Sequence, residues 1–441
     1  MQRSRNGRVT ESRYGAPDSG GRAKQRAFCI GAMPEGEDLS ELEELLRTAG
    51  VATVGQLVQH REKPHPNLYL GPGKVEELKP LLKAADANLV ACDDELTPRQ
   101  ERNLEKEIGL PVIDRTAVIL DIFADHAHSA EGKMQVELAQ LEYNMARMRG
   151  LWTHLERLGA GRGVGGIGTR GPGESQIETD RRLARDRITA LKRRLDHVRS
   201  TRAVQRAERE RAHLPSVALA GYTNAGKSTL LNALTGSEVG VRDRLFHTLD
   251  PTTRTLQLQG RTFLMTDTVG FIRKLPHQLV DAFSATLEET RLADLILHVV
   301  DGSVDEDEMV GMMRAVDDVL DEIGAGDQPR LLVLNKADAI DDERREELRF
   351  RHPEGILVSA LTGEGLDVLG ERVERAFRET LRSVDLLLPF DQGGRLAELH
   401  DIAGELDRTD TAEGVRVRGR VPATVAERFA RFDVSENGAG S

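Results

Sequence analysis

A phosphate-binding loop pattern constrains the fold of this 441-residue chain more than any other feature of its sequence. The segment GYTNAGKS at 221–228 matches G-x-x-x-x-G-K-S, with the apolar SVALA before it and the helix-forming TLLNALTG after it. Glycines let backbone N–H groups close around phosphate oxygens, and the dipole of the following helix favours their negative charge. Lys227 then places its charge on the β- and γ-phosphates, and the Ser228 hydroxyl ligates Mg²⁺. The predicted phosphate-binding residues are Gly221, Tyr222, Thr223, Asn224, Ala225, Gly226, Lys227 and Ser228.

A second motif predicts which base is bound. NKAD at 335–338 follows the apolar LLVL, 108 residues after Lys227. The carboxylate of Asp338 can accept hydrogen bonds from N1–H and N2–H₂ of guanine, whereas adenine offers no such pair of donors. SAL at 359–361 follows the strand-like ILV and is correctly placed to bond the base through its backbone. The predicted base-binding residues are Asn335, Lys336, Ala337, Asp338, Ser359, Ala360 and Leu361.

Two segments between these motifs predict a response to the γ-phosphate. Asp267 can hold a Mg²⁺-bound water, and the N–H of Gly270 can sense the γ-phosphate. A threonine of FHTLDPTT at 246–253 can complete the Mg²⁺ shell, but the residues alone do not separate Thr248, Thr252 and Thr253 from one another or from turn-forming hydroxyls. The residues of both segments expected at the nucleotide are Phe246, His247, Thr248, Leu249, Asp250, Asp267, Thr268, Val269 and Gly270.

The residue after Gly270 is Phe271, where Ras-like GTPases carry a glutamine that orients the attacking water. A phenyl ring cannot orient water. We therefore expect slow hydrolysis that is completed by another residue, a monovalent cation or a partner molecule. Phe271 is equally compatible with a core position.

Changes of pattern along the chain predict an α/β protein in several parts. Strand–helix alternation recurs on both sides of a long helical hairpin, and it predicts mainly parallel sheets with flanking helices. The predicted parts are a disordered basic tail at 1–26, a small α/β domain at 27–131, a helical hairpin at 132–213 with a glycine-rich loop at 159–173, a P-loop GTPase domain at 214–381 and a small C-terminal α/β unit at 384–441.

The net charge of −12 is unevenly distributed. Residues 1–26 sum to +5 and residues 181–213 to +8, with twelve basic and four acidic residues in the latter. The acidic surplus lies in the presumed globular parts, so the total does not exclude a nucleic-acid partner. No apolar stretch is long enough for a membrane span or a signal peptide, and two cysteines, Cys29 and Cys92, cannot build a disulfide framework. We expect a cytoplasmic protein and leave peripheral membrane association open.

With these residues in order, the chain resembles the HflX family of GTPases over about residues 27–381. The nucleotide motifs alone indicate only a GTPase, and the narrower resemblance rests on flanking signatures. These are YLGPGKVEEL at 69–78, GPGESQIETDRR at 171–182, GYTNAGKSTLLN at 221–232, FHTLDPTTR at 246–254 and DTVGFIRKLPHQLVDAFSATLEE at 267–289.

The resemblance implies hydrolysis of GTP to GDP and phosphate with Mg²⁺, and it selects among the open alternatives. The family's switch threonine lies in an F-A-T-L-D motif, which corresponds to Thr248, with His247 in place of the usual alanine. Ser228 and Thr248 would then ligate Mg²⁺, Asp267 would act through water, and Lys227, Thr248 and Gly270 would be catalytic. The family typically has a hydrophobic residue at the position of Phe271. Asn224 matches an asparagine that helps to bind a catalytic K⁺ in related GTPases.

The resemblance also implies a ribosomal partner. Family members bind the large (50S) subunit and can split stalled or idle ribosomes, with the hairpin directed toward the peptidyl-transferase region of 23S rRNA. A monomer suffices, and no DNA partner is expected. The rRNA contacts expected here are Arg162, Arg170, Arg181, Arg182, Lys192, Arg193 and Arg194.

Two other classes of function are compatible with parts of the sequence. One is an RNA-remodelling enzyme that uses ATP on the N-terminal domain, where GPGK at 71–74 loosely resembles a phosphate loop but lacks the Ser or Thr after the lysine. The other is a GTP-controlled signalling switch with a protein target. The absence of a lipidation motif counts against direct membrane anchoring of such a switch.

Overall fold

The chain forms two compact units, each described here by itself. The first contains residues 1–198 and two short segments from later in the chain, 243–250 and 274–284; the second contains 199–242, 251–273 and 285–441. The computed structural model describes residues 25–36, 38–147, 176–211, 214–236, 245–246, 248–258, 261–274, 284–379, 381–402 and 406–434. The tail predicted up to residue 24 and the glycine-rich loop predicted at 159–173 lie outside them.

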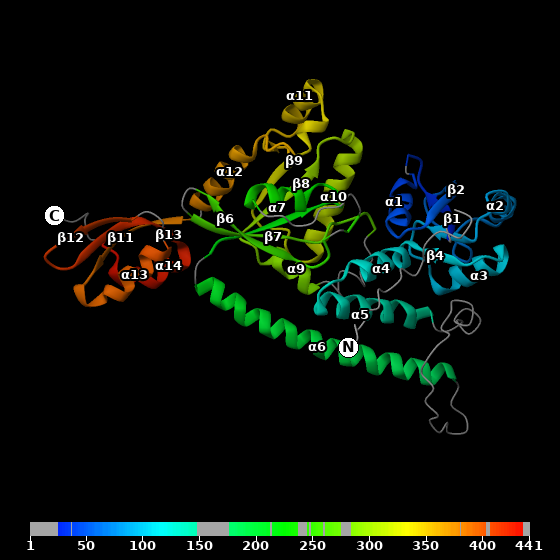
Figure 1. The fold of residues 1–441 in the computed structure, drawn as a ribbon, viewed down its shortest axis with the longest axis horizontal. Helices are drawn as coiled ribbons and strands as arrows, with labels where there is room; N and C mark the ends of the chain where they lie inside the picture. The colour runs from blue at the N-terminus through cyan, green and yellow to red at the C-terminus, as the bar shows by residue number, and fades with distance from the viewer. Residues whose placement is uncertain are drawn as a thin grey trace, which may run out of the picture. The chain divides into compact units, whose positions relative to one another are not determined.

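A four-stranded, all-parallel sheet organises the N-terminal part of the first unit (Figure 1). Across the sheet the strands are β2 (Ala52–His60), β1 (Arg26–Met33), β3 (Leu89–Cys92) and β4 (Val112–Asp114). Residues 27–33 of β1 are all buried, as expected for a parallel strand covered on both faces. The helices are α1 (Ser40–Thr48), α2 (Pro72–Ala84), α3 (Pro98–Ile108) and α4 (Arg115–His126). The prediction of a small parallel α/β domain is confirmed.

Two helix starts show how local sequence sets this domain. Thr97 caps α3 in a capping box with Gln100, and Gly109 ends the helix with a φ of 72°. The GPGK segment begins α2 instead of forming a phosphate cradle. The N–H of Gly71 donates to Gln59 at 2.8 Å, and the ammonium of Lys74 pairs with Glu77 at 2.9 Å.

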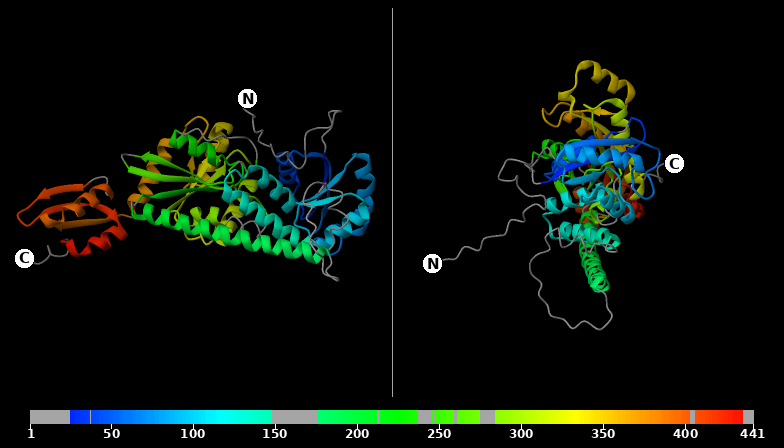
Figure 2. Two further views of the ribbon diagram at one scale, coloured as in Figure 1. Left: turned by 60° about the horizontal axis from the view of Figure 1, so that its bottom comes forward. Right: turned by 90° about the vertical axis from the view of Figure 1, so that its right-hand side faces the viewer.

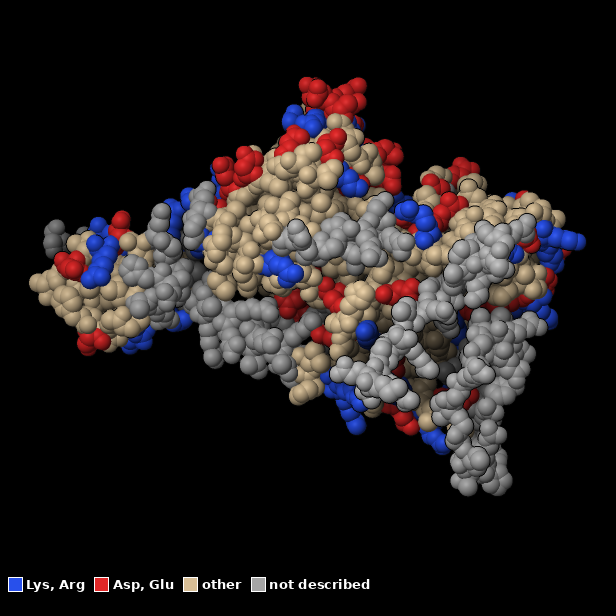
Figure 3. Space-filling view, in the orientation of Figure 1, with Lys and Arg blue, Asp and Glu red and all other residues tan. Residues whose placement is uncertain are grey.

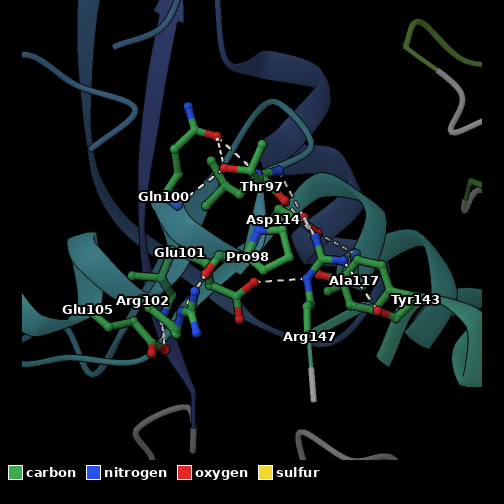
Figure 4. Close-up of polar contacts among 12 residues, drawn as sticks. Thr97, Pro98, Gln100, Glu101, Arg102, Glu105, Asp114, Ala117, Tyr143 and Arg147 are labelled. Atoms are coloured by element: carbon green, nitrogen blue, oxygen red, sulfur yellow. Dashed lines mark hydrogen bonds and ion pairs between the residues drawn. The ribbon is translucent and has the colours of Figure 1, made fainter. Parts of the chain in front are cut away.

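A buried ion-pair network fastens α5 (Ala130–Arg147) to the N-terminal sheet (Figure 4). Arg147 donates to the Asp114 carboxylate at 2.7 Å, to the Leu96 carbonyl at 2.8 Å and to Glu101 at 2.9 Å. The Tyr143 hydroxyl donates to Asp114 at 2.7 Å, and the guanidinium lies 3.5 Å from the centroid of the Tyr143 ring. Asp114, which is 1% exposed, is thereby compensated on both carboxylate oxygens.

The second long helix, α6 (Gln176–Arg211), forms the other half of the predicted hairpin. Leu138 of α5 packs with Ile188, Leu191 and Leu195 of α6. Ion pairs at the edge of this seam join Arg187 to Glu137 at 2.7 Å and Lys192 to Glu142 at 2.8 Å. Figure 2 shows the two helices side by side.

The second unit is built around a six-stranded sheet. Across it the strands are β10 (Ile356–Leu357), β9 (Arg330–Asn335), β8 (Leu295–Asp301), β5 (Ser216–Gly221), β7 (Arg261–Asp267) and β6 (Thr252–Leu258). All neighbours are parallel except β6, which runs antiparallel to β7. The flanking helices are α7 (Lys227–Thr235), α9 (Ser284–Arg291), α10 (Glu306–Glu322), α11 (Asp342–Arg351) and α12 (Leu366–Glu379), with a 3₁₀ turn at Ala337–Ala339. The predicted parallel sheet with flanking helices is confirmed.

The C-terminal part is a three-stranded antiparallel sheet in the order β11 (Leu381–Leu388), β13 (Val415–Pro422) and β12 (Leu406–Asp410). Helices α13 (Gly393–Ile402) and α14 (Ala423–Phe429) cover its apolar face, with 3₁₀ turns at Phe390–Gln392 and Ala430–Phe432. β11 crosses the boundary that the sequence suggested near 381–384. β12 reads LDRTD, which carries no apolar alternation and is not predictable from its own residues.

Charged side chains of both signs gather on α11, which carries four acidic and four basic residues. Figure 3 shows Asp and Glu side chains over this helix, and the exposed residues there include Asp341, Asp342, Glu343 and Glu346. Within the described residues, no helix combines the length and apolar character that crossing a membrane requires.

Replacing Arg147 with Met should destabilise the first unit, because the buried Asp114 carboxylate would lose its ionic partner. Removing one member of a buried pair costs about 3–5 kcal/mol, measurable as a lower urea midpoint by circular dichroism. Arg187→Met is the matched control, since it removes an arginine from an exposed pair and should have a far smaller effect. Equal shifts for the two variants would contradict the role given to Arg147.

Candidate nucleotide site

The phosphate-binding loop joins β5 to α7, as its sequence context predicts. Gly226 has a φ of 92°, and a Cβ there would lie 2.3 Å from Nδ2 of Asn335. A Cβ on Gly221 would lie 2.2 Å from the Val299 carbonyl oxygen of the neighbouring strand. Both glycines are therefore required by close approach, and Gly226 also by its backbone conformation.

Two side chains at the start of α7, Lys227 and Ser228, are the predicted ligands of a phosphate and a cation. Lys227 donates to the carbonyls of Gly221 at 3.0 Å and Tyr222 at 2.8 Å. Burial lowers the pKa of Lys227 to about 8, and the charge of Asp267 opposes this shift. The Ser228 hydroxyl donates to Asp267 at 2.5 Å. This pair of oxygen donors suits a hard cation such as Mg²⁺.

The DTVG segment continues β7 and is bonded to the phosphate loop. The Thr268 hydroxyl donates to the Leu219 carbonyl at 2.7 Å. The N–H of Phe271 donates to Gly221 at 3.1 Å, and the Phe271 carbonyl accepts from Thr223 at 2.8 Å. Gly270 packs so tightly that a Cβ would lie 2.9 Å from Cγ2 of Thr223. Val269 is buried in the same segment.

Phe271 is thus a core residue whose backbone joins the phosphate-binding loop to the DTVG segment. Its side chain is 1% exposed. The Tyr222 hydroxyl adds a further tie by accepting from the N–H of Arg273 at 2.8 Å. A buried phenyl group offers no donor or acceptor to a water molecule, so the position cannot do the work of a glutamine.

The base-recognition motif is tied to the phosphate loop through Asn335. Its Nδ2 donates to the Ala225 carbonyl at 2.8 Å, and its Oδ1 accepts from the N–H of Ala360 at 3.0 Å. Asp338 accepts a hydrogen bond from the Ser359 hydroxyl. These contacts bring the NKAD and SAL motifs together, as the sequence predicts.

The remaining residues of the NKAD and SAL motifs lie close to Asn335 and Asp338 in the sequence and have contacts of their own. Lys336 has a φ of 66° and pairs with Asp301 at 2.5 Å. The N–H of Ala337 donates to the Val358 carbonyl at 3.0 Å. Leu361 is 78% exposed, so its apolar side chain is available to lie against a planar base.

The three candidate threonines lie in different structural settings. Thr252 and Thr253 begin β6, where Thr252 pairs with Asp267 and the Thr253 hydroxyl lies 3.0 Å from the Thr266 hydroxyl. Thr248 lies outside any strand and is partly buried within the first unit. Its neighbours Phe246, Leu249 and Asp250 are described, whereas His247 lies outside the described residues.

Several contacts within the first unit involve residues in or next to the predicted switch segments. No nucleotide-binding motif indicates these contacts. The ammonium of Lys274 pairs with Asp93 at 3.0 Å and with Asp94 at 2.7 Å. His126 and Ser129 contact Phe246 and Asp250. Their partners are 120 or more residues away in sequence, so local patterns could not have identified them.

The predicted rRNA-contacting residues fall into two groups. Arg162 and Arg170 lie outside the described residues. On α6, Arg182, Arg193 and Arg194 are exposed and Arg181 is half-buried, whereas Lys192 pairs with Glu142.

The chain is similar to known proteins along most of its length. Residues 36–124 match the family described as GTP-binding GTPase N-terminal, 126–209 the GTP-binding GTPase Middle Region, and 216–336 the 50S ribosome-binding GTPase family. A protein of Lacrimispora saccharolytica described as GTPase HflX is 47% identical over 394 residues, covering 89% of this chain and 91% of that protein. GTPase HflX of Escherichia coli is 45% identical over 392 residues, covering 87% and 89%.

Among solved structures, the crystal structure of SsGBP with GDP matches 80% of this chain and 98% of its own, with 25% identity and a TM-score of 0.44. Identity above 40% over most of both chains establishes the relationship to the curated relatives. The three matched regions follow one another in the order of the N-terminal domain, the hairpin and the nucleotide site. The chain therefore belongs to the HflX family of GTPases.

Proposed function

We propose that this GTPase binds the large ribosomal subunit in its GTP form and splits or rescues stalled or idle ribosomes, with hydrolysis lowering its affinity for release. The observation that carries the proposal is the presence, in one chain, of a guanine-nucleotide site and a basic helix. The exposed residues of α6 include Arg182, Arg185, Arg193 and Arg194. The matched description, 50S ribosome-binding GTPase, supports the same partner.

The chemistry assigns each site residue a role. Lys227 stabilises charge on the β- and γ-phosphates, and the backbone N–H of Gly270 senses the γ-phosphate. Ser228 and Thr248 would hold Mg²⁺, with Asp267 acting through a bound water; the metal supplies neutralisation of phosphate charge. The match of FHTLD to the family's F-A-T-L-D motif supports Thr248 over Thr252 and Thr253.

Asp338 selects the guanine edge, while Asn335 holds the base loop against the phosphate loop. Since Phe271 cannot orient the attacking water, that task falls to a group supplied from elsewhere. We propose that K⁺ bound with the help of Asn224 contributes to hydrolysis. Asn224 has a φ of 60° and lies in the loop that precedes α7.

Asp338→Asn should weaken GTP binding and improve binding of xanthosine triphosphate. Guanine loses hydrogen bonds to a charged acceptor, each contributing about 1.5–3 kcal/mol, whereas an amide N–H₂ can donate to the O2 atom of xanthine. We expect at least a tenfold loss for GTP by calorimetry. ATP is the control, and its weak binding should not change. Unaltered GTP affinity would contradict the base assignment.

GTP turnover should be faster in K⁺ than in Na⁺ at equal ionic strength. Asn224→Gly should remove this difference, because glycine tolerates the positive φ while losing the amide oxygen. Initial rates of phosphate release measure both effects. Identical turnover of the unmodified chain in the two salts would rule out the K⁺ role.

The chain should co-sediment with purified large subunits more strongly with a non-hydrolysable GTP analogue than with GDP or without nucleotide. Lys227→Ala should bind no better with the analogue than without it, since it lacks the phosphate-binding charge. Equal pelleting of the unmodified chain under all three conditions would refute GTP control.

The same assay locates the contact surface. Replacing Arg182, Arg193 and Arg194 with Ala should lower affinity and flatten its salt dependence, because fewer phosphate-bound counterions are released. The matched control replaces the exposed Arg349, Arg351 and Arg375 and should leave the salt dependence unchanged. An unchanged slope for the α6 variant would move the rRNA contact away from this face.

A further inference from the structure

The guanidinium group of Arg345, on α11, joins the two loops that carry the base-recognition motifs. It donates two hydrogen bonds to the Glu364 carboxylate, at 2.6 and 3.1 Å. It also donates to the Ala337 carbonyl at 2.7 Å. Ala337 directly precedes Asp338 in NKAD, and Glu364 lies three residues after Leu361, the last residue of SAL. One side chain therefore holds both loops, and we call this arrangement the Arg345–Glu364 clamp.

Further contacts close a ring that begins and ends at Asp338. The main-chain carbonyl of Glu364 accepts from the N–H of Ser359 at 2.9 Å. The Ser359 hydroxyl in turn donates to the Asp338 carboxylate. Ser359 and Ala337 are both 0% exposed, so the inner part of the ring is shielded from water. The ring thus links Asp338 to Arg345 through both loops.

The orientation of the Asp338 carboxylate decides whether guanine can be recognised. Asp338 is exposed, and one of its oxygens accepts from Ser359. A carboxylate has about four acceptor sites, so Asp338 can still accept from N1–H and N2–H₂ of guanine. Two hydrogen bonds to one base edge require a fixed carboxylate, and a freely rotating one would lose conformational entropy when the base binds.

We propose that Arg345 and Glu364 are positioning residues of the guanine site: by joining the NKAD and SAL loops, they hold Asp338 in the orientation that accepts both guanine hydrogen bonds. The inference rests on the proposed role of Asp338 in base recognition. Neither Arg345 nor Glu364 belongs to a predicted nucleotide-binding motif, and both lie in the second unit with the phosphate loop. Because GDP and GTP share the base, the clamp favours both nucleotides equally.

Arg345→Met in the full chain tests this directly, with inosine diphosphate (IDP) as the probe. Hypoxanthine lacks the N2 amino group, so it can donate only N1–H to Asp338. Loosening Asp338 should therefore weaken GDP binding more than IDP binding. We expect the Kd for GDP and for a non-hydrolysable GTP analogue to rise about fivefold, and the preference for GDP over IDP to fall about threefold. The Tm should change little, because the side chains of the removed ion pair are 21% and 44% exposed.

Arg351→Met is the matched control, since Arg351 lies on the same helix and pairs with Glu347 at 2.9 Å. It should leave both affinities unchanged. Steady-state kinetics give a second readout. Arg345→Met should raise the KM for GTP and leave kcat within about twofold, because hydrolysis is expected to be slow relative to GTP dissociation and the phosphate-binding residues are unaltered.

Two further variants make the outcome decisive. Glu364→Ala should reproduce the loss, and Glu364→Gln, which keeps an acceptor for Arg345, should lose less. The double variant of Arg345→Met and Glu364→Ala should lose no more than the larger single variant, because both substitutions remove the same clamp. Equal losses for GDP and IDP, additive losses in the double variant, or unchanged affinities would overturn the inference.

Asp338→Asn separates the two proposals. If it leaves the preference for GDP over IDP unchanged, the role of Asp338 in base recognition fails. If it lowers that preference and Arg345→Met does not, only the positioning role fails.

Discussion

The nucleotide site depends on the parallel alignment of five strands in the second unit. Parallel neighbours in the order β10, β9, β8, β5 and β7 bring their carboxyl ends to one edge of the sheet. At that edge lie Gly221, Asp267, Asp301 and Asn335, each the last residue of its strand. Open α/β sheets bind ligands at this edge because polar loop residues meet there above an apolar core. The register of the parallel strands thus brings these residues together in space although they are far apart in sequence.

Backbone and amide contacts then join the loops at this edge. The bridge between Tyr222 and Phe271 ties the phosphate loop to the DTVG segment, and Asn335 ties it to the base loop. These ties use the side-chain amide of Asn335 and the backbone of Phe271, so they do not occupy the side chains of Lys227, Ser228 or Asp338. Phe271 holds the phosphate loop through its backbone and packs in the core through its ring. Its side chain therefore supplies no polar group for hydrolysis.

The first unit depends on compensated burial of charge. Asp114 is paired with Arg147 and Tyr143, and Asp93 with Arg115 and Lys274. Both partners of each pair are needed, because an unpaired buried charge is strongly unfavourable. Lys274 and Asp250 come from segments that follow the phosphate loop, and both are bound by residues from before residue 130. The unit is therefore completed by residues distant in sequence.

The sequence by itself determined the elements whose information is local. Local patterns of residues are sufficient to indicate the strand–loop–helix order around GYTNAGKS and the two hairpin helices. They are also sufficient for the cap at Thr97 and for the end of α3 at Gly109. NKAD and SAL could likewise be predicted to bind guanine from their own residues. Only the tertiary structure decided that Phe271 is a buried bridge, that Lys192 is paired with Glu142, and that LDRTD forms a strand. It also decided that Ser129 and Gly132 receive Asp250. These contacts join groups that are far apart in the chain. The residues next to a side chain in the sequence do not indicate which distant residues it will contact in the folded protein.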